Sequence, residues 1–375
     1  MILSGGGTAG HIYPALAVAD ELRRRGHSLT YVGTPTGPEA QLAPAAGLEF
    51  IGVAAAGFDR ARPQTLVTSS LQILRSAARV RRLITRVGAD AVVGFGGYVA
   101  IPVGWAATRA GIPLAIHEQN SIMGMTNRFL AKRAQFIALT YPDTVDAARA
   151  VAPGTARVEF TGNPVRAEVI AGDAAAARER FGLADPAATT DATILTVFGG
   201  SRGARHLNTA ISGLAARLLT EHPGLEIVHA AGPAEYDSVL AAREQLSDIL
   251  RARWHVVDYL QDMGDVLAAT DVACTRAGAT TIAELTAAGV PAVLVPYPYA
   301  TDDHQTGNAR ALVAAGGARL IPDAELDTDA LWDVLHQLVT DADLRATMGA
   351  SARKLGRVDA AARLADGIEH MIQER

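Results

Sequence analysis

The sequence predicts an α/β protein made of two doubly wound, Rossmann-like domains, and three observations support this. Its 375 residues are enough for two domains of ordinary size. Short β-branched runs alternate with alanine-rich helical stretches, which is typical of βαβ units around a parallel sheet. Each half opens with a strand, a glycine loop and a helix. We therefore expect the domains to face one another across a central cleft, with ligands beyond the carboxyl ends of the strands.

In the first half, short apolar runs bounded by glycine or proline are expected to be strands. They span residues 2–3, 28–32, 91–94, 113–117, 136–139 and 158–161, with helices near 13–25 and 65–87. Gly162-Asn163-Pro164 is expected to form the hinge, because glycine and proline interrupt regular structure. This places the domains at 1–161 and 162–354.

The second half repeats the pattern, with strands expected at 193–198, 226–230, 254–257, 272–274 and 292–295 and a helix at 208–220. The helices after about Asp341 can cap either domain. We place the last one, at about 355–375, back on the first domain.

Composition and charge exclude several classes of protein. The formal net charge of -5 disfavours a globally basic nucleic-acid binder. The one cysteine, Cys274, rules out an internal disulfide framework and fits a reducing compartment. The N-terminus carries no charged leader of the secretory type. The uncharged run 91–108 is as long as a membrane span, but its glycines and proline favour a strand, a glycine loop and a helix.

The first glycine loop, Gly5–Gly10, fits the pattern G-x-G-x-x-G and lies between a strand and a helix. The second strand ends in Tyr31-Val32-Gly33-Thr34-Pro35 without an acid for a ribose, which disfavours NAD. His11 follows the loop directly, where an imidazole can accept a proton near neutral pH. The alternative is a histidine that only caps or packs.

The second glycine loop, residues 199–203, adds the hydroxyl of Ser201 to a helix N-terminus, which suits a leaving diphosphate. A tight turn that needs glycine only for packing is the alternative. Neither loop ends in Gly-Lys-Ser/Thr, so ATP hydrolysis is disfavoured. The ten histidines lack metal-ligand spacing, and no metal site is predicted.

Several motifs in order make the chain resemble a known family. They are Gly6-Gly7-Thr8-Ala9-Gly10-His11, Gly96-Gly97-Tyr98, His117-Glu118-Gln119-Asn120, Gly162-Asn163-Pro164-Val165-Arg166, Gly199-Gly200-Ser201, Arg276-Ala277-Gly278-Ala279-Thr280-Thr281 with Glu284, and Asp303-His304-Gln305. From Leu3 to about Gly316, the chain resembles the bacterial UDP-N-acetylglucosamine:N-acetylmuramyl-(pentapeptide) pyrophosphoryl-undecaprenol N-acetylglucosamine transferases.

This resemblance implies the GT-B fold and an inverting transfer of GlcNAc from UDP-GlcNAc. The acceptor it implies is the 4-hydroxyl of MurNAc-pentapeptide on undecaprenyl diphosphate, so that lipid I becomes lipid II in peptidoglycan synthesis. It further implies peripheral attachment at the cytoplasmic face of the cell membrane, and other wall-synthesis proteins as partners. No cofactor is expected, and a divalent cation would assist the diphosphate without a dedicated protein cage.

The same resemblance places a set of residues around UDP-GlcNAc. They are Thr8, Ala9, Gly10, Asn120, Arg166, Ser201, Leu260, Ala279, Thr280, Thr281, Ile282, Ala283, Glu284 and Gln305. Arg166 and Ser201 suit the diphosphate, which gains charge as the glycosidic bond breaks. Glu284 suits two ribose hydroxyls, and the backbone at Leu260 the uracil edge. The plainer alternatives are that Glu284 is an ordinary helix acid and Asn120 a turn residue.

Direct displacement needs a base for the acceptor hydroxyl. His11 is the first candidate, because it lies at the loop where the acceptor is expected, and Glu118 and His117 are the alternatives.

A basic segment has no other assigned role. Between residues 60 and 89 there are seven arginines and no acid, interleaved with apolar residues: Arg60, Arg62, Arg75, Arg79, Arg81, Arg82 and Arg86. An anionic membrane surface is the expected partner, and a helix with its apolar stripe in the core is the alternative. Two rival functions also remain, a UDP-GlcNAc 2-epimerase-like enzyme and a nucleotide-sugar-binding scaffold.

Overall fold

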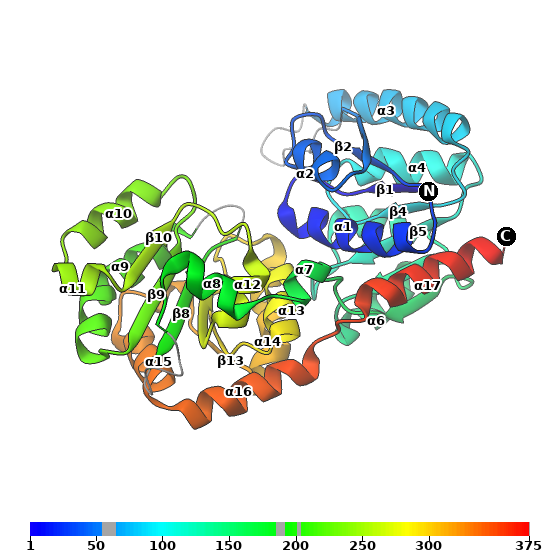
Figure 1. Cartoon of the computed structure of the whole chain (residues 1–375). Helices are drawn as coiled ribbons and strands as arrows, with labels where there is room; N and C mark the ends of the chain where they lie inside the picture. The colour runs from blue at the N-terminus through cyan, green and yellow to red at the C-terminus, as the bar shows by residue number, and fades with distance from the viewer. Residues whose placement is uncertain (55–64, 185–191, 201–203, 375) are drawn as a thin grey trace. The chain divides into compact units, whose positions relative to one another are not determined.

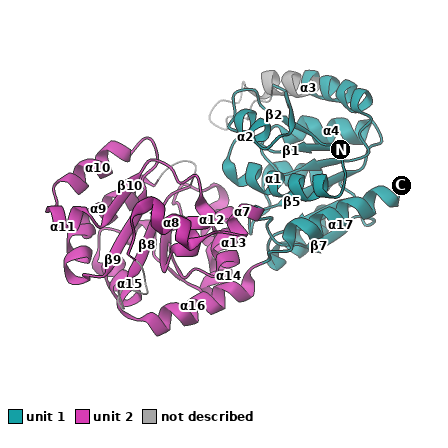
Figure 2. Cartoon of the chain, viewed as in Figure 1, with its two compact units in different colours: residues 1–166, 357–375 teal, residues 167–356 magenta. Residues whose placement is uncertain are grey.

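The computed structural model describes residues 1–54, 65–184, 192–200 and 204–374, without the side chains of 65–74. The chain divides into two compact units, which Figure 2 shows in different colours. Unit 1 is Met1–Arg166 together with Arg357–Arg375, and unit 2 is Ala167–Gly356. The first boundary lies five residues beyond the expected position at 161, and the last helix belongs to unit 1.

Unit 1 contains a parallel sheet with the strand order β3-β2-β1-β4-β5-β6-β7 (Figure 1). Its strands are β1 (Ile2–Ser4), β2 (Thr30–Gly33), β3 (Glu49–Gly52), β4 (Val92–Gly94), β5 (Leu114–Glu118), β6 (Phe136–Leu139) and β7 (Arg157–Phe160). β1 pairs with β2 on one side and with β4 on the other. The strand order therefore reverses at β1, and the loops after β1 and β4 lie at the switch point where such folds bind ligands.

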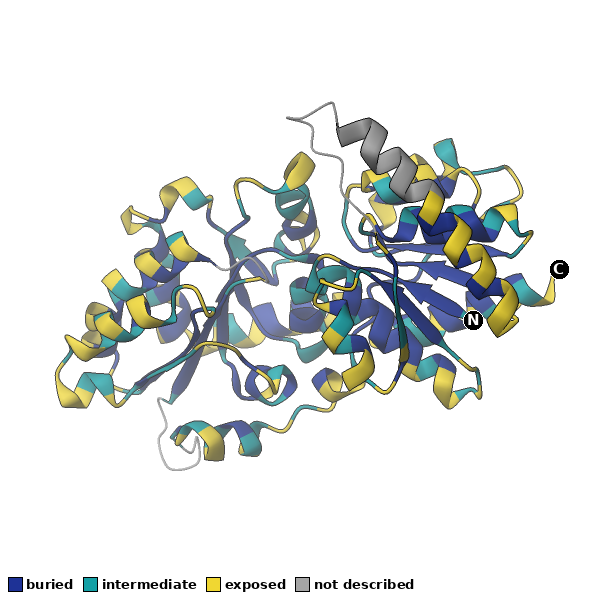
Figure 3. Cartoon of the chain, turned by 90° about the horizontal axis from the view of Figure 1, so that it is seen from above, coloured by how far each residue is buried: buried dark blue, intermediate teal, exposed yellow. Residues whose placement is uncertain are grey.

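Helices cover both faces of this sheet (Figure 1). They are α1 (Ala9–Arg24), α2 (Glu39–Ala45), α3 (Thr65–Val87), α4 (Ala100–Arg109), α5 (Met125–Ala131), α6 (Val145–Val151) and α17 (Ala360–Gln373). One core cluster joins α3, α4 and α5 to the strands, and another joins α1 and α17 to them. Figure 3 shows the strands buried between these layers.

The C-terminal helix α17 packs tightly on unit 1. Leu364 and Ile368 are fully buried in the same cluster as Leu22 and Phe136. A side chain at Gly367 would come within 2.2 Å of the Phe136 ring, so glycine permits the close approach.

α1 begins four residues earlier than predicted, at Ala9 rather than Tyr13. Gly10 and Pro14 both lower helix propensity, yet Ile12 and Leu16 are buried in the core. Packing of this apolar face outweighs the unfavourable residues.

Unit 2 contains a parallel sheet with the strand order β10-β9-β8-β11-β12-β13. Its strands are β8 (Thr193–Phe198), β9 (Leu225–Ala230), β10 (Trp254–Val257), β11 (Val272–Thr275), β12 (Ala292–Leu294) and β13 (Ala318–Leu320). Its helices are α7 (Ala167–Ile170), α8 (Ala174–Phe181), α9 (Arg205–Glu221), α10 (Tyr236–Glu244), α11 (Asp248–Arg251), α12 (Met263–Ala269), α13 (Ala279–Ala288), α14 (His304–Ala314), α15 (Asp329–Thr340) and α16 (Ala342–Leu355). Here the order reverses between β8 and β11, which again places two loops at a switch point.

The uncharged run 91–108 forms β4, a glycine loop and most of α4, as expected. Among the residues that the structure describes, no helix combines the length and the apolar character needed to cross a membrane.

Candidate active site

Two glycine loops of unit 1 pack against each other at the switch point of its sheet. The backbone φ of Gly97 is +75°, and a Cβ there would lie 2.3 Å from the carbonyl oxygen of Gly6. The φ of Gly96 is +97°, and a Cβ there would lie 2.9 Å from Cδ2 of His11. Both positions therefore need glycine for backbone angle and for space. The loop after β4 forms a wall beside His11.

His11 lies in the first turn of α1 with its ring oriented by the preceding loop. Its Nδ1 is 3.0 Å from the carbonyl oxygen of Gly6 and 3.2 Å from Oγ1 of Thr8. A carbonyl oxygen can only accept, so the neutral imidazole carries its proton on Nδ1. Nε2 is then the basic nitrogen, next to Gly96. This tautomer suits a general base.

Glu118, the last residue of β5, uses both carboxylate oxygens to order the following turn. Oε1 accepts from the backbone N–H of Asn120 at 3.0 Å, and Oε2 accepts from Gly124 N–H at 3.0 Å and from Asn127 Nδ2 at 2.9 Å. The side chain is only 2% exposed. Both oxygens of Glu118 are therefore engaged in the turn, and the geometry favours His11 over Glu118. Asn120 is held in this turn.

His117 is fully buried and bonded at both ring nitrogens. Nε2 lies 3.0 Å from the carbonyl oxygen of Gly162, and Nδ1 lies 3.1 Å from Nε2 of Gln119. Burial lowers the pKa of His117 to about 4, although the bond to Gly162 opposes this. The ring is therefore neutral at pH 7 and ties β5 to Gly162 within unit 1, which disfavours it as the base.

In unit 2, Gln305 joins two loops at the carboxyl edge of the sheet. Its Oε1 accepts from Ala277 N–H at 3.1 Å, after β11, and from Tyr297 N–H at 2.8 Å, after β12. The carbonyl end of Gln305 thus has a structural role in joining the two loops.

The predicted run 279–284 forms the first half of α13, which starts beside the loop held by Gln305. Glu284 is 6% exposed, and Ala279 and Ile282 are buried, whereas Thr280, Thr281 and Ala283 are partly exposed. The N-terminus of α13 and the loop after β8 lie at neighbouring strand ends, because β8 pairs with β11. The sheet therefore brings together two of the predicted elements.

Two further predicted residues lie in other elements. Leu260 is buried in the loop after β10, which is an edge strand. Arg166 belongs to unit 1, where its guanidinium carbon is 4.1 Å from the centre of the Tyr13 ring on α1. Ser201 lies outside the described residues.

Sequence reasoning missed a charged network behind the loops of unit 2. Buried Arg276 pairs with Asp323, and Asp323 Oδ2 also accepts from Nδ1 of His206 at 2.7 Å. Burial acts to raise the pKa of the Asp323 carboxyl, but its bonds to His206 and Arg276 outweigh this and lower it. His206 and Asp323 are 117 residues apart, so no local pattern links them.

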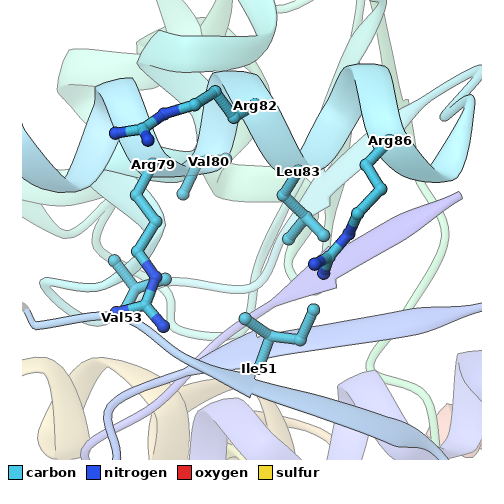
Figure 4. A pocket seen from close by; sticks show the side chains of 7 residues that line it. All are labelled: Ile51, Val53, Arg79, Val80, Arg82, Leu83 and Arg86. Carbon is cyan, nitrogen blue, oxygen red and sulfur yellow. The ribbon is translucent and has the colours of Figure 1, made fainter.

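The basic face of α3 lines two hollows. Figure 4 shows the first, of about 280 Å³, where Arg79, Arg82 and Arg86 surround apolar side chains of α3 and β3. The second, of about 970 Å³, is shared by α3 and α4 and lined by Ala77, Ala78, Arg81, Arg82, Thr85, Arg86, Trp105, Ala106 and Arg109. No acidic residue lines either hollow.

The apolar residues of the described half of α3 do not face outward. Val80, Leu83 and Ile84 are at most 5% exposed and belong to the core of unit 1. In this half the apolar stripe therefore packs into the core, as in the alternative interpretation, because the sheet needs cover on this face. The arginines remain exposed. The other predicted members of the segment, including Arg60 and Arg62, lie outside the described side chains.

No group of three or more histidine, cysteine, aspartate or glutamate side chains is placed to hold a metal ion in the described part of the chain.

Comparisons with known proteins identify the family of this chain. The glycosyltransferase family 28 N-terminal domain matches residues 1–139, and the corresponding C-terminal domain matches residues 194–364. A relative from Desulforudis audaxviator is 40% identical and covers 99% of this chain and 98% of its own length. It is named UDP-N-acetylglucosamine–N-acetylmuramyl-(pentapeptide) pyrophosphoryl-undecaprenol N-acetylglucosamine transferase. The chain belongs to this transferase family, within glycosyltransferase family 28.

Solved structures show the same fold. MurG of Acinetobacter baumannii is 29% identical with a TM-score of 0.74, covering 98% of this family 28 chain and 99% of that one. The two parallel-sheet units are thus those of a GT-B glycosyltransferase. A Listeria monocytogenes structure described as a UDP-N-acetylglucosamine 2-epimerase has a TM-score of 0.69 at 15% identity, covering 100% of this chain and 96% of its own. That likeness extends to the fold alone.

Proposed function

We propose that this family 28 hexosyltransferase moves GlcNAc from UDP-GlcNAc to the MurNAc of the undecaprenyl-diphosphate-linked pentapeptide, converting lipid I to lipid II. The observation that carries the proposal is identity of 40% over 99% of the chain with a relative named for this transfer. Such similarity spans both units, and therefore both halves of a two-substrate reaction.

In this proposal His11 is the general base on the acceptor side. Nε2 removes the proton of the MurNAc 4-hydroxyl as its oxygen bonds to the anomeric carbon of GlcNAc. The bond from that carbon to the UDP oxygen breaks, and attack from the opposite side inverts the configuration. The His11 tautomer set by Gly6 supports this role.

On the donor side, the leaving diphosphate gains negative charge. Ser201, Arg166 and the helix N-termini are proposed to stabilise it. Glu284 is proposed to accept from the ribose hydroxyls, and the backbone at Leu260 to bind the uracil. Gln305 and Asn120 offer amide groups for the sugar, and Thr8, Ala9, Gly10, Ala279, Thr280, Thr281, Ile282 and Ala283 complete the proposed surroundings.

Two substitutions separate these roles. His11→Ala should lower kcat about a hundred- to ten-thousand-fold with donor affinity nearly unchanged, since it removes only the base. Glu284→Gln should weaken UDP-GlcNAc binding about 10- to 100-fold, as expected when a charged acceptor is lost. Steady-state kinetics and calorimetric titration of UDP-GlcNAc measure both effects, with His370→Ala at an exposed position of α17 as the control. Near-normal turnover of His11→Ala would place the base elsewhere.

We further propose that the arginines of α3 bind anionic lipid at the cytoplasmic membrane face, where a lipid-linked acceptor resides. In the described half of α3 this attraction is electrostatic, because Val80, Leu83 and Ile84 are in the core. Each basic side chain near an anionic surface contributes about 1 kcal/mol.

Sedimentation with vesicles containing anionic lipid tests this second part. At about 1 kcal/mol for each basic side chain, replacing Arg75, Arg79 and Arg82 by glutamate should reduce binding by about tenfold or more, and salt should reduce wild-type binding. Replacing Arg149, Arg310 and Lys354 by glutamate makes the same change of net charge at exposed positions elsewhere. Equal loss in both triple variants would exclude a specific role of α3.

A further inference from the structure

A buried carboxylate lies beneath the first glycine loop. Glu39, the first residue of α2, is fully buried. Its Oε2 accepts from the backbone N–H of Gly7 at 3.2 Å. Its Oε1 accepts from the backbone N–H of Thr34 at 2.9 Å and from Thr34 Oγ1 at 2.6 Å. Burial of a charge is costly unless it is bonded in this way, so the site is built for a carboxylate.

Three glycines from separate positions make room for it. A Cβ on Gly6 would lie 2.2 Å from Oε1 of Glu39, one on Gly37 2.3 Å from Oε2, and one on Gly33 2.4 Å from Cγ. Gly6 has no φ in the left-handed range, so the space, rather than its backbone angle, requires glycine there. The first glycine loop is therefore shaped around Glu39.

The same loop orients His11. Gly6 contributes the carbonyl that accepts from Nδ1 of His11 at 3.0 Å, and the next residue, Gly7, donates to Glu39. Glu39 thus holds one end of the Gly6–Gly7 unit, and His11 depends on the other.

We propose that Glu39 is a positioning residue for the transfer reaction. It fixes the first glycine loop so that the Gly6 carbonyl holds the His11 tautomer with Nε2 basic. The inference rests on the proposed function, because it assumes that His11 is the base. It also changes the interpretation of the loop, since the Gly7 N–H is taken by Glu39 and is not available to an anionic ligand.

Glutamine is the informative substitution. The two carboxylate oxygens face N–H donors on both sides, whereas glutamine has one oxygen and one NH₂. The NH₂ of Glu39→Gln would face either Gly7 N–H or Thr34, donor against donor. The loop should shift although side-chain size is nearly unchanged.

Kinetics with UDP-GlcNAc and a lipid I analogue provide the first test. Glu39→Gln should lower kcat about 10- to 100-fold, as a displaced base would, while the KM for UDP-GlcNAc changes less than about threefold. Glu226→Gln is the matched control, because Glu226 is 7% exposed and accepts from His255 at 2.9 Å within unit 2. Thr34→Val removes one hydrogen-bond donor to Glu39 and should lower kcat by a smaller factor. This variant provides the test if Glu39→Gln does not fold.

A double variant shows whether Glu39 acts through His11. In the His11→Ala background, Glu39→Gln should cost less than about threefold more, because groups that act as a unit are not additive. Full multiplication of the two losses, or kcat within about twofold of wild type in folded Glu39→Gln, would overturn the proposal.

A spectroscopic readout does not depend on activity. In protein with ¹⁵N-labelled histidine, the His11 ring should show the Nδ1–H tautomer in wild type and a mixture of tautomers in Glu39→Gln. An unchanged tautomer would contradict the proposal. If the wild-type protein transfers no GlcNAc, the proposed function fails. If His11→Ala retains turnover, the assignment of His11 as the base fails. Both results come from proteins in which Glu39 is intact. The two failures are therefore distinguishable.

Discussion

At the residue scale, hydrogen bonds separate three side chains that share the chemistry of a base. Both carboxylate oxygens of Glu118 accept hydrogen bonds from the turn after β5 and from α5. His117 is buried with a pKa lowered to about 4. His11 differs from both, because its Nδ1 donates to the Gly6 carbonyl and the lone pair of the neutral ring is then on Nε2. Residue type identifies candidates, and only the partners of each atom rank them.

Alanine substitutions at glycines test whether the contact between the two glycine loops of unit 1 contributes to the stability of that unit. Gly97→Ala should destabilise unit 1 by about 1–2 kcal/mol for the left-handed backbone and about 1–3 kcal/mol more for the clash with the Gly6 carbonyl. Gly88→Ala is the control, since its φ is +58° and a Cβ there would have no other atom within 4 Å.

The three tryptophans allow the units to be followed separately. With Trp254 and Trp332 replaced by phenylalanine, Trp105 fluorescence during urea unfolding reports on unit 1. Equal losses in Gly97→Ala and Gly88→Ala would show that the loop contact contributes no stability.

Glu39 shows what residue patterns cannot reveal. In the sequence, Glu39 is a single acidic residue after Gly37-Pro38, and no recognisable motif surrounds it. Its role depends on Gly6 and Gly7, more than thirty positions away, and these lie beside it only after β1 and β2 have paired. His11 could be named as a candidate from the sequence because it directly follows a recognisable loop.

At the scale of elements, neutral His117 joins β5 to Gly162, which follows β7. Its pKa in the folded protein, about 4, is below the ordinary value of 6.5, so the folded state binds fewer protons between these values. The stability it contributes is present above pH 6.5 and is lost as the pH falls toward 4.

This predicts an acid-dependent weakening of unit 1. Between pH 7 and pH 5, His117 should account for about 2 kcal/mol of lost free energy of unfolding. His117→Gln should show a shallower decline, followed by Trp105 in the background described above. Buried His229 has a pKa lowered to about 3 but belongs to unit 2, which this probe does not report. Parallel pH profiles for both proteins would refute the linkage.

Several strands were predictable, and two edge strands were not. β6, β8 and β10 have the predicted bounds because they are short apolar runs with clear ends. β3 (Glu49–Gly52) and β13 (Ala318–Leu320) were missed. Each has three or four residues, includes a charged residue and pairs on one side only. Such strands form because a neighbouring strand offers its hydrogen bonds, which local pattern does not show.

At the scale of the whole molecule, the chain forms two units and returns to the first at its end. Arg25 of α1 bonds to Asp366 at 2.6 Å and to Glu369 at 2.7 Å, and α17 adds its apolar face to the core of unit 1. From the sequence we expected the last helix to pack back on the first domain, although the terminal helices could cap either one; in the structure α17 belongs to unit 1. Family similarity covers both units, which is what a reaction with two substrates requires.

The central claim is acceptor-dependent transfer of GlcNAc. The most direct measurement incubates the protein with radiolabelled UDP-GlcNAc, with and without a lipid I analogue, and separates the lipid products. The account predicts labelled disaccharide lipid only when the acceptor is present, and its loss in His11→Ala. Conversion of UDP-GlcNAc without acceptor, or donor binding without any transfer, would contradict it.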